Sequence, residues 1–316
     1  MTELPVPVVS GPVPSIAGAD PASVQEVLRR LELQVNRRLD GLLHGDHRGL
    51  TPGHGSELGE AREYIPGDDV RRIDWNVTAR MQRPHVRDTV ADRELETWLL
   101  VDASASLDFG TARAEKRELA IAAVAAIGFL TARVGNRLGA VLLQNGTVEE
   151  VPARNGRNHL LSILHRLQDA PRDQGRADLA AGLRRLSAPG HRRGMAVVIT
   201  DLLDAGWEDA LRRTSVSHDT LVIEIIDPRE MELPNIGVVD LVDPESGRVR
   251  ELNTSSDRVR TAYADAAREQ RERNARKIRE ARCSHLVLRT DSDWLFDVVT
   301  FVARRKRQAA YAETTR

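Results

Sequence analysis

From residue 98 onward, short apolar runs alternate with stretches whose apolar residues recur at helical spacing. We predict strands from the runs Trp98–Val101, Leu138–Leu143, Met195–Thr200, Thr220–Ile226 and His285–Leu288. Helices are predicted near 113–132, 157–168, 177–187, 207–213 and 256–282, with a closing helix at 293–306. Alternation of strand and helix is typical of a parallel sheet with helices on both faces. The sequence therefore predicts an α/β fold with a doubly wound, mostly parallel sheet.

Two stretches depart from this alternation and predict hairpins. Asn145-Gly146 follows the second strand and precedes Val148–Val151, and this dipeptide favours a tight turn between antiparallel strands. A second pair of short strands, Ile236–Leu241 and Arg248–Leu252, flanks a glycine-containing turn. We therefore expect a small β-hairpin insertion near residues 236–252.

The N-terminal third is organised differently. Residues 1–20 are rich in Pro, Gly, Val and Ala and predict a disordered tail. A helix is predicted over residues 21–39, because Ser23 and Glu26 form a capping-box pattern ahead of a helical apolar repeat. Residues 41–60 are glycine-rich and predict a loop. We assign 21–97 to an N-terminal helix and a charged segment packed on the following domain, and 98–310 to the α/β domain.

Composition excludes several classes of protein. The chain has 316 residues, with 46 Lys and Arg against 47 Asp and Glu, so its charge balance does not favour nucleic acid or anionic membranes. Cys283 stands alone, which rules out an internal disulfide and fits a reducing compartment. The longest apolar stretch, Leu119–Leu130, is shorter than the ~20 residues that span a bilayer. We expect a cytoplasmic protein that neither binds nucleic acid nor inserts into a membrane.

Sequence signatures of common enzymes are missing. The chain holds no G-x-x-x-x-G-K-[ST] phosphate loop, no G-x-S-x-G elbow and no H-E-x-x-H motif. His44, His47 and His54 lack the cysteine partners and spacing of a structural zinc site. We therefore expect a non-catalytic protein, and the alternative is a metal-dependent, phosphoesterase-like hydrolase.

The first predicted strand ends in a cluster of oxygen-bearing side chains. Asp102, Ser104 and Ser106 follow it on alternate positions, and Asp201 ends the strand at 195–200. Ligands gather at the carboxyl ends of parallel strands, and hard oxygen donors suit Mg²⁺. The alternative is structural, because Asp and Ser also form turns that cap a following helix.

These residues resemble a known site. The strand ending in D-A-S-A-S, the later strand ending in T-D and the Rossmann-type alternation are similar to a von Willebrand factor A-type domain. That resemblance implies a metal-ion-dependent adhesion site that holds Mg²⁺ or Mn²⁺ on D-x-S-x-S, a separate Thr and a separate Asp. The matching residues are Asp102, Ser104, Ser106 and Asp201. The Thr position holds Ala177, so Asp178 or a water would supply the missing oxygen, and the alternative is a vestigial, metal-free site.

The segment before this strand resembles a second signature. Residues 62–80, R-E-Y-I-P-G-D-D-V-R-R-I-D-W-N-V-T-A-R, are similar to the bacterial domain-of-unknown-function 58 family, with a match over about 41–253. Members are commonly encoded beside MoxR-type AAA+ ATPases. The resemblance implies an adaptor or co-chaperone for such an ATPase, with membrane-anchored von Willebrand A proteins as further candidate partners. A scaffold with a dead site is the remaining alternative.

The arginines of this segment allow two interpretations. They form a salt-bridge lattice that holds the segment to the sheet, or they dock an acidic or phosphorylated partner. For the second case the predicted anchors are Arg71, Arg72 and Arg80.

The predicted helix 256–282 is densely charged. Glu269 and Arg273, and Glu272 and Arg276, stand four residues apart and can pair along one face. We interpret this helix as solvated.

Overall fold

The computed structural model describes residues 61–65, 70, 73–87, 96–133, 135–144, 146–172, 175–242 and 248–314, together with Arg29, Leu33 and Arg37. Two compact units are present, one of residues 51–94 and one of 1–50 with 95–316. The boundary at residue 94 lies close to the predicted start of the α/β domain. The predicted tail 1–20, the loop 41–60 with its three histidines and most of the predicted helix 21–39 lie outside the described residues. Arg29, Leu33 and Arg37 are helical, as predicted.

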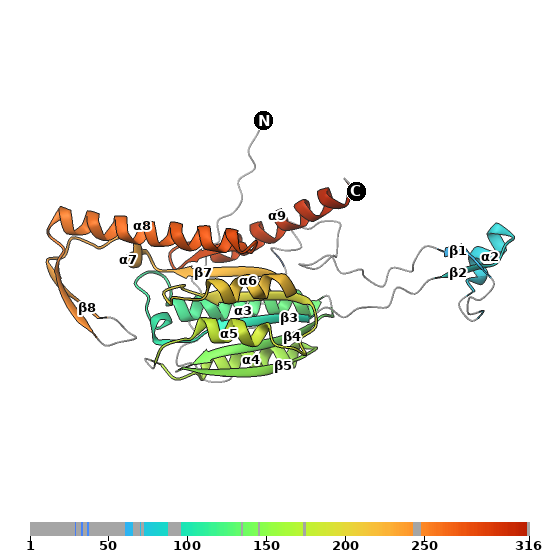
Figure 1. The fold of residues 1–316 in the computed structure, drawn as a ribbon, viewed down its shortest axis with the longest axis horizontal. Helices are drawn as coiled ribbons and strands as arrows, with labels where there is room; N and C mark the ends of the chain where they lie inside the picture. The colour runs from blue at the N-terminus through green and yellow to red at the C-terminus, as the bar shows by residue number, and fades with distance from the viewer. Residues whose placement is uncertain are drawn as a thin grey trace, which may run out of the picture. The chain divides into compact units, whose positions relative to one another are not determined.

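Among the described residues, the larger unit is built on a six-stranded sheet (Figure 1). In spatial order its strands are β10 (Ser284–Arg289), β7 (Asp219–Ile226), β6 (Gly194–Thr200), β3 (Glu96–Asp102), β4 (Arg137–Gln144) and β5 (Thr147–Arg154). The first five strands run parallel, and β5 turns back antiparallel to β4 through the predicted hairpin. The predicted fold class, a doubly wound and mostly parallel sheet, is confirmed.

Helices cover both faces of this sheet (Figure 1). One layer contains α3 (Lys116–Arg133), α4 (Arg157–Gln168) and α9 (Trp294–Thr314), and the other contains α5 (Leu179–Leu186), α6 (Glu208–Ser217) and α8 (Asp257–Glu280). Alternate residues of β3 serve the two layers. Leu99 and Val101 belong to the core with α3, whereas Trp98 and Leu100 belong to the core with α5. This alternation follows from the two-residue period of a strand.

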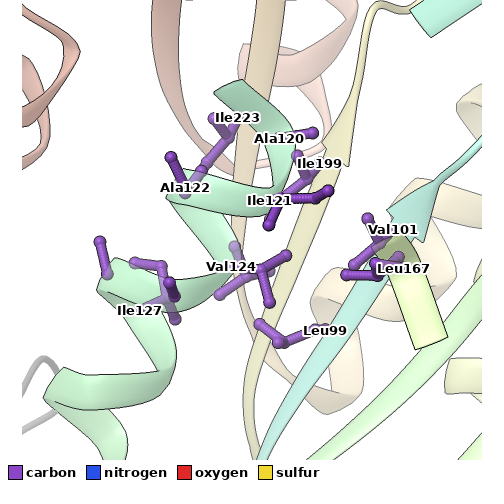
Figure 2. Packing of buried hydrophobic residues seen from close by; sticks show 14 of the residues in the cluster. Leu99, Val101, Ala120, Ile121, Ala122, Val124, Ile127, Leu167, Ile199 and Ile223 are labelled. Carbon is purple, nitrogen blue, oxygen red and sulfur yellow. The ribbon is translucent and has the colours of Figure 1, made fainter. Parts of the chain in front are cut away.

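Helix α3 is the centre of the first layer. Residues 119–127 are all buried, because the helix lies between the sheet and its neighbours α4 and α9. Figure 2 shows Ile121 and Val124 of this helix beside Leu99, Val101 and Ile199 of the underlying strands. A helix that is apolar all round is a core helix. Its burial fixes the position of its first residue, Lys116, at the edge of the sheet.

The second hairpin is confirmed and two elements extend further than predicted. β8 (Val238–Val242) pairs antiparallel with β9 (Val249–Asn253). α6 runs to Ser217 instead of 213, since the hydroxyl of Thr214 is buried and donates to the carbonyls of Leu183 and Ala210. α9 continues to Thr314, and the short helix α7 (Pro228–Met231) was not predicted. Within the described part of the chain, no helix has the length and apolar character needed to cross a membrane.

The smaller unit contains part of the charged segment. β1 (Ala61–Glu63) pairs antiparallel with β2 (His85–Arg87), and α2 (Trp75–Met81) lies between them in the sequence. Asp74 caps α2, because one carboxylate oxygen accepts from the backbone N–H groups of Asn76 (3.0 Å) and Val77 (3.2 Å). The aspartate of the signature therefore has a local structural role, because Asp74 caps the helix that begins at Trp75.

Candidate functional site

Two of the predicted site residues meet at the topological switch point of the sheet. The chain passes from β3 to β4 on one side and later returns to β6 on the other side of β3. Asp102 ends β3 and Asp201 follows β6, and the register pairs Val101 with Ile199 just before them. Ligands of open α/β sheets bind in the crevice at such a point. The prediction that Asp102 and Asp201 share one sheet edge is confirmed.

The carboxylate of Asp102 is buried and held by neutral donors. Oδ1 accepts from the backbone N–H of Ser104 (2.9 Å), and Oδ2 accepts from the hydroxyl of Thr200 (2.9 Å). Burial, followed by the charge of Asp201, raises the pKa of Asp102 to about 6. The bond to Ser104 is the Asp-centred turn that we gave as the structural alternative, so Asp102 has a structural role whatever else it binds.

The hydroxyls of the motif join the same cluster. Ser104 Oγ lies 3.1 Å from Ser106 Oγ, and Ser106 hydrogen-bonds the carboxylate of Asp201. All four side chains are nearly inaccessible, with exposures of 5% for Asp102, 0% for Ser104, 2% for Ser106 and 2% for Asp201. The structure thus brings the motif together, but beneath the surface rather than on it.

A lysine that the sequence analysis did not identify lies inside this cluster. Lys116 Nζ is 2.8 Å from Asp201 Oδ2 and 2.5 Å from Glu230 Oε1, and the residue is completely buried. Its ammonium also faces the ring of Phe109 at 6.0 Å. Burial alone would lower the pKa of Lys116, but the charges of Asp201 and Glu230 outweigh it and raise that pKa. For Asp201, burial alone would raise the pKa of the carboxyl. The charge of Lys116 outweighs burial, so the pKa of Asp201 is lowered.

The network continues through the charged helix α8. Arg271 Nη1 donates to the backbone carbonyl of Asp201 (2.8 Å) and to Glu224 Oε1 (2.8 Å), and Nη2 lies 3.5 Å from Glu230. Glu224 is 1% exposed, and its second oxygen lies 2.9 Å from His285 Nε2. Buried carboxylates require such partners. One set of charges therefore joins the loop after β6 to β7, β10, α3, α7 and α8.

Two local signals point to this network in retrospect. Glu224 interrupts the apolar run of β7, and Lys116 lies three residues before the apolar stretch that begins at Leu119. The interpretation of α8 as solvated is correct for the pair Arg273–Glu269, 2.8 Å apart and partly exposed, but wrong for Arg271. The spacing of charges along α8 does not distinguish the two faces, because both carry arginines.

Asp178 occupies a different position from the one proposed for a metal ligand. Its Oδ1 accepts from the backbone N–H of Ala181 (2.7 Å) at the start of α5, and the residue is exposed. Ala177 beside it is buried, and the backbone N–H of Ala105 donates to the carbonyl of Gly175 (3.4 Å). The loop therefore lies next to the D-x-S-x-S turn as the resemblance implies, but its carboxylate caps a helix.

The donors present do not fit the magnesium site that the resemblance implies. Position 177 offers no side-chain oxygen, and Asp178 is engaged by its own helix. Asp201 is already neutralised by Lys116, whose positive charge would repel a cation bound to the same carboxylate. In addition, the described residues contain no group of three or more His, Cys, Asp or Glu side chains placed to hold a metal ion.

Asp108 belongs to a separate buried ion pair. Arg117 donates hydrogen bonds to both oxygens of the Asp108 carboxylate, from Nε and from Nη2 (2.9 Å). Nη2 also donates to the carbonyl of Ala103 (3.1 Å). A hydrolase with Asp102 as its nucleophile would need a nearby acid, and Asp108 is the local candidate. Here it fixes the loop after β3 to α3.

The predicted partner-binding arginines are only partly visible. Arg71 and Arg72 lie outside the described residues, and Arg80 is exposed in the last turn of α2. Their role as anchors stays a prediction.

The sequence matches the family described as "Protein of unknown function DUF58" over residues 60–273, more than half of the chain. The chain belongs to this family. The match confirms the resemblance drawn from residues 62–80, although it begins at 60 instead of 41 and ends at 273 instead of 253. Among relatives of this DUF58 protein, "Uncharacterized protein Rv1480" of Mycobacterium tuberculosis is 51% identical over 313 residues, covering 98% of each chain. "Uncharacterized protein MAV169" of Mycobacterium avium is 43% identical over 162 residues, covering 50% of this chain and 95% of that one.

Solved structures with a similar arrangement include an aerotolerance-related membrane protein from Bacteroides fragilis and BatB from Bacteroides thetaiotaomicron. Both have a TM-score of 0.43, with 15% and 13% identity, and they cover 68% and 69% of the DUF58 chain and 99% of their own. The VWA domain of SpRpn10 has a TM-score of 0.38 and 14% identity, covering 65% of this chain and 93% of its own. The strand order of the sheet establishes the fold class independently of these neighbours.

Proposed function

We propose that this DUF58 protein is a non-catalytic adaptor that binds a MoxR-type AAA+ ATPase through the loops at the carboxyl edge of its sheet. The choice of partner rests on the resemblance of residues 62–80, since members of the family are commonly encoded beside such ATPases. The choice of surface rests on the loops described next.

The observation that carries the proposal is a pair of exposed apolar side chains over the buried cluster. Phe109, in the loop after β3, is 39% exposed, and Leu203, in the loop after β6, is 38% exposed. Both are tied to the same charges, because Lys116 faces the ring of Phe109 and the backbone N–H of Leu203 donates to Asp201 (3.3 Å). Apolar anchors held on a rigid base are typical of interface hot spots.

The protonation and pairing of the site favour binding over catalysis. Asp201 and Asp108 are each held by a buried cation, and Asp102 accepts two hydrogen bonds out of reach of solvent. A nucleophile or general base must reach the substrate. The cluster supports a role in shaping the surrounding loops, and the partner would contact those loops rather than the carboxylates.

The test is a binding assay with the purified MoxR-type ATPase from the same genome. The variants are Phe109→Ser and Leu203→Ser, and the control is Val216→Ser, which removes a 75% exposed valine at the end of α6, before β7 begins. We expect weaker binding for the first two variants by about fivefold or more, since losing an apolar anchor costs upward of about 1 kcal/mol. The control should bind like wild type.

Each binding assay is repeated with Mg²⁺ and with a chelator. Equal binding in both conditions is expected for a metal-free surface. Full binding by both loop variants would refute this surface, and hydrolysis of generic phosphate esters that is lost in Asp102→Ala would favour the hydrolase alternative instead.

A further inference from the structure

We propose that Lys116 is the resident cation of the strand-end cluster and that its ammonium replaces the metal of the related adhesion sites. This inference concerns the cluster alone and holds whether or not the proposed partner is correct. The D-x-S-x-S motif of a metal site is present, yet a lysine ammonium already lies on the carboxylate of Asp201.

The position of the ammonium is fixed from several sides. Nζ contacts Asp201 at 2.8 Å and Glu230 at 2.5 Å, so it joins the end of β6 to α7. The backbone N–H of Lys116 donates to the carbonyl of Phe109 (2.9 Å), which ties the loop after β3 to the same residue. A metal ion at the implied site would link the loops after β3 and β6 through its ligands. Here the ammonium links Asp201 to Glu230 and the backbone of the same residue holds the loop after β3, so no ion has to be recruited.

The local charges leave no vacancy for a second cation on Asp201. A magnesium ion binds a carboxylate oxygen at about 2.1 Å. The ammonium is already 2.8 Å from Oδ2, and the backbone N–H of Leu203 donates to Oδ1 at 3.3 Å. A magnesium ion and the Lys116 ammonium would therefore be buried side by side, where solvent screens their repulsion little. Arg271 adds a further positive charge on the carbonyl of Asp201.

Removing the ammonium should therefore create a metal site. Without it, Asp201 loses its cation and Glu230 keeps only Arg271 at 3.5 Å. These carboxylates, Asp102 and the two serine hydroxyls form a set of hard oxygen donors. The test compares wild type with Lys116→Met, and Lys277→Met serves as the matched control. Lys277 also pairs with a carboxylate, Glu208, and faces an aromatic ring, Trp207, at 5.6 Å, but it is 39% exposed.

The measurement is the melting temperature with EDTA, Mg²⁺ or Mn²⁺. Wild type and Lys277→Met should not respond to metal. Lys116→Met should melt lower in EDTA and gain about 5–10 °C at a metal concentration ~100 times Kd, because a ligand that binds only the folded state stabilises it. If this variant does not fold in EDTA, refolding in Mn²⁺ gives the same readout, and recovery supports the proposal.

Two results would overturn it. One is a wild-type melting temperature that rises with Mg²⁺ or Mn²⁺ and loses that response in Asp102→Asn, since metal and ammonium would then share the site. The other is a Lys116→Met protein that neither responds to metal when folded nor recovers in its presence. If the melting temperature of wild type rises with metal and that of Asp102→Asn rises equally, the metal binds outside the strand-end cluster, which agrees with the proposal.

Discussion

Replacing Asp102 with Asn should make the protein more stable at neutral pH, although the residue lies at the centre of the site. Burial and the charge of Asp201 raise the pKa of Asp102 from 3.8 to about 6 in the folded protein. The folded state therefore binds this proton more tightly than the unfolded chain does. Stability is highest with the proton bound and falls as the pH rises through the interval between those two pKa values.

The size of the effect follows from the shift. A change from 3.8 to about 6 corresponds to about 3 kcal/mol above pH 6. Asn carries no charge, so it avoids this penalty, and its oxygen can still accept from the backbone N–H of Ser104. Weakening the bond from Thr200 costs about 1 kcal/mol. The net gain near pH 7.5 is about 2 kcal/mol, or a melting temperature higher by about 4–8 °C.

The assay is thermal unfolding followed by circular dichroism from about pH 4 to pH 8. The two curves should approach each other as the pH falls and cross near the acid end, where Asp102 is protonated in both the folded and the unfolded state and only the weakened bond from Thr200 separates the two proteins. Asp209→Asn is the control, because this aspartate is 77% exposed and should not change the profile. The reasoning would be refuted if Asp102→Asn melted lower than wild type at every pH. It would also be refuted if the melting temperatures of the two proteins differed by the same amount at every pH.

Three further substitutions test the packing and the network. Gly128→Ala should cost about 1–3 kcal/mol in chemical denaturation, because the new Cβ would lie 2.3 Å from Leu160 Cδ1, and adding Leu160→Ala should remove that clash. Arg271→Met removes the guanidinium from Glu224, which keeps His285, and from Glu230, which keeps Lys116, so it should lower the unfolding free energy by about 3 kcal/mol, whereas Arg273→Met on the exposed face should be nearly neutral in the same urea titration. Asp227→Ala removes the acceptor of Thr111 (2.9 Å) and Thr290 (2.8 Å), so limited proteolysis should cut these loops faster.

The elements of the fold could be predicted because their signals are local. Continuous apolar runs predicted β3, β4, β6, β7 and β10, and the carboxyl-edge rule placed Asp102 beside Asp201 from the sequence. The end of α6 could not be predicted, since Thr214 is held by Leu183 of another helix.

The cation of the site could not be predicted because its partners are distant in sequence. Lys116 is separated from Asp201 by 85 positions and from Glu230 by 114. A lysine at the start of a helix is usually solvated, and the apolar stretch 119–127 that follows this one is the only local hint of its burial. Arg271 was missed for the same reason, because its carboxylates lie on β7 and α7.

The charge network also constrains the order in which the chain can fold. Lys116 leaves the ribosome long before Asp201 and Glu230, and Arg271 and His285 follow later still. Until α8 docks, Glu224 would be buried in β7 without its guanidinium, which is costly. The parallel strands β7 and β10 therefore gain their full stability only in a late step that closes long loops, and such steps are slow. Refolding should show a phase that reports the docking of α8, and Arg271→Met should alter that phase more than the earlier collapse.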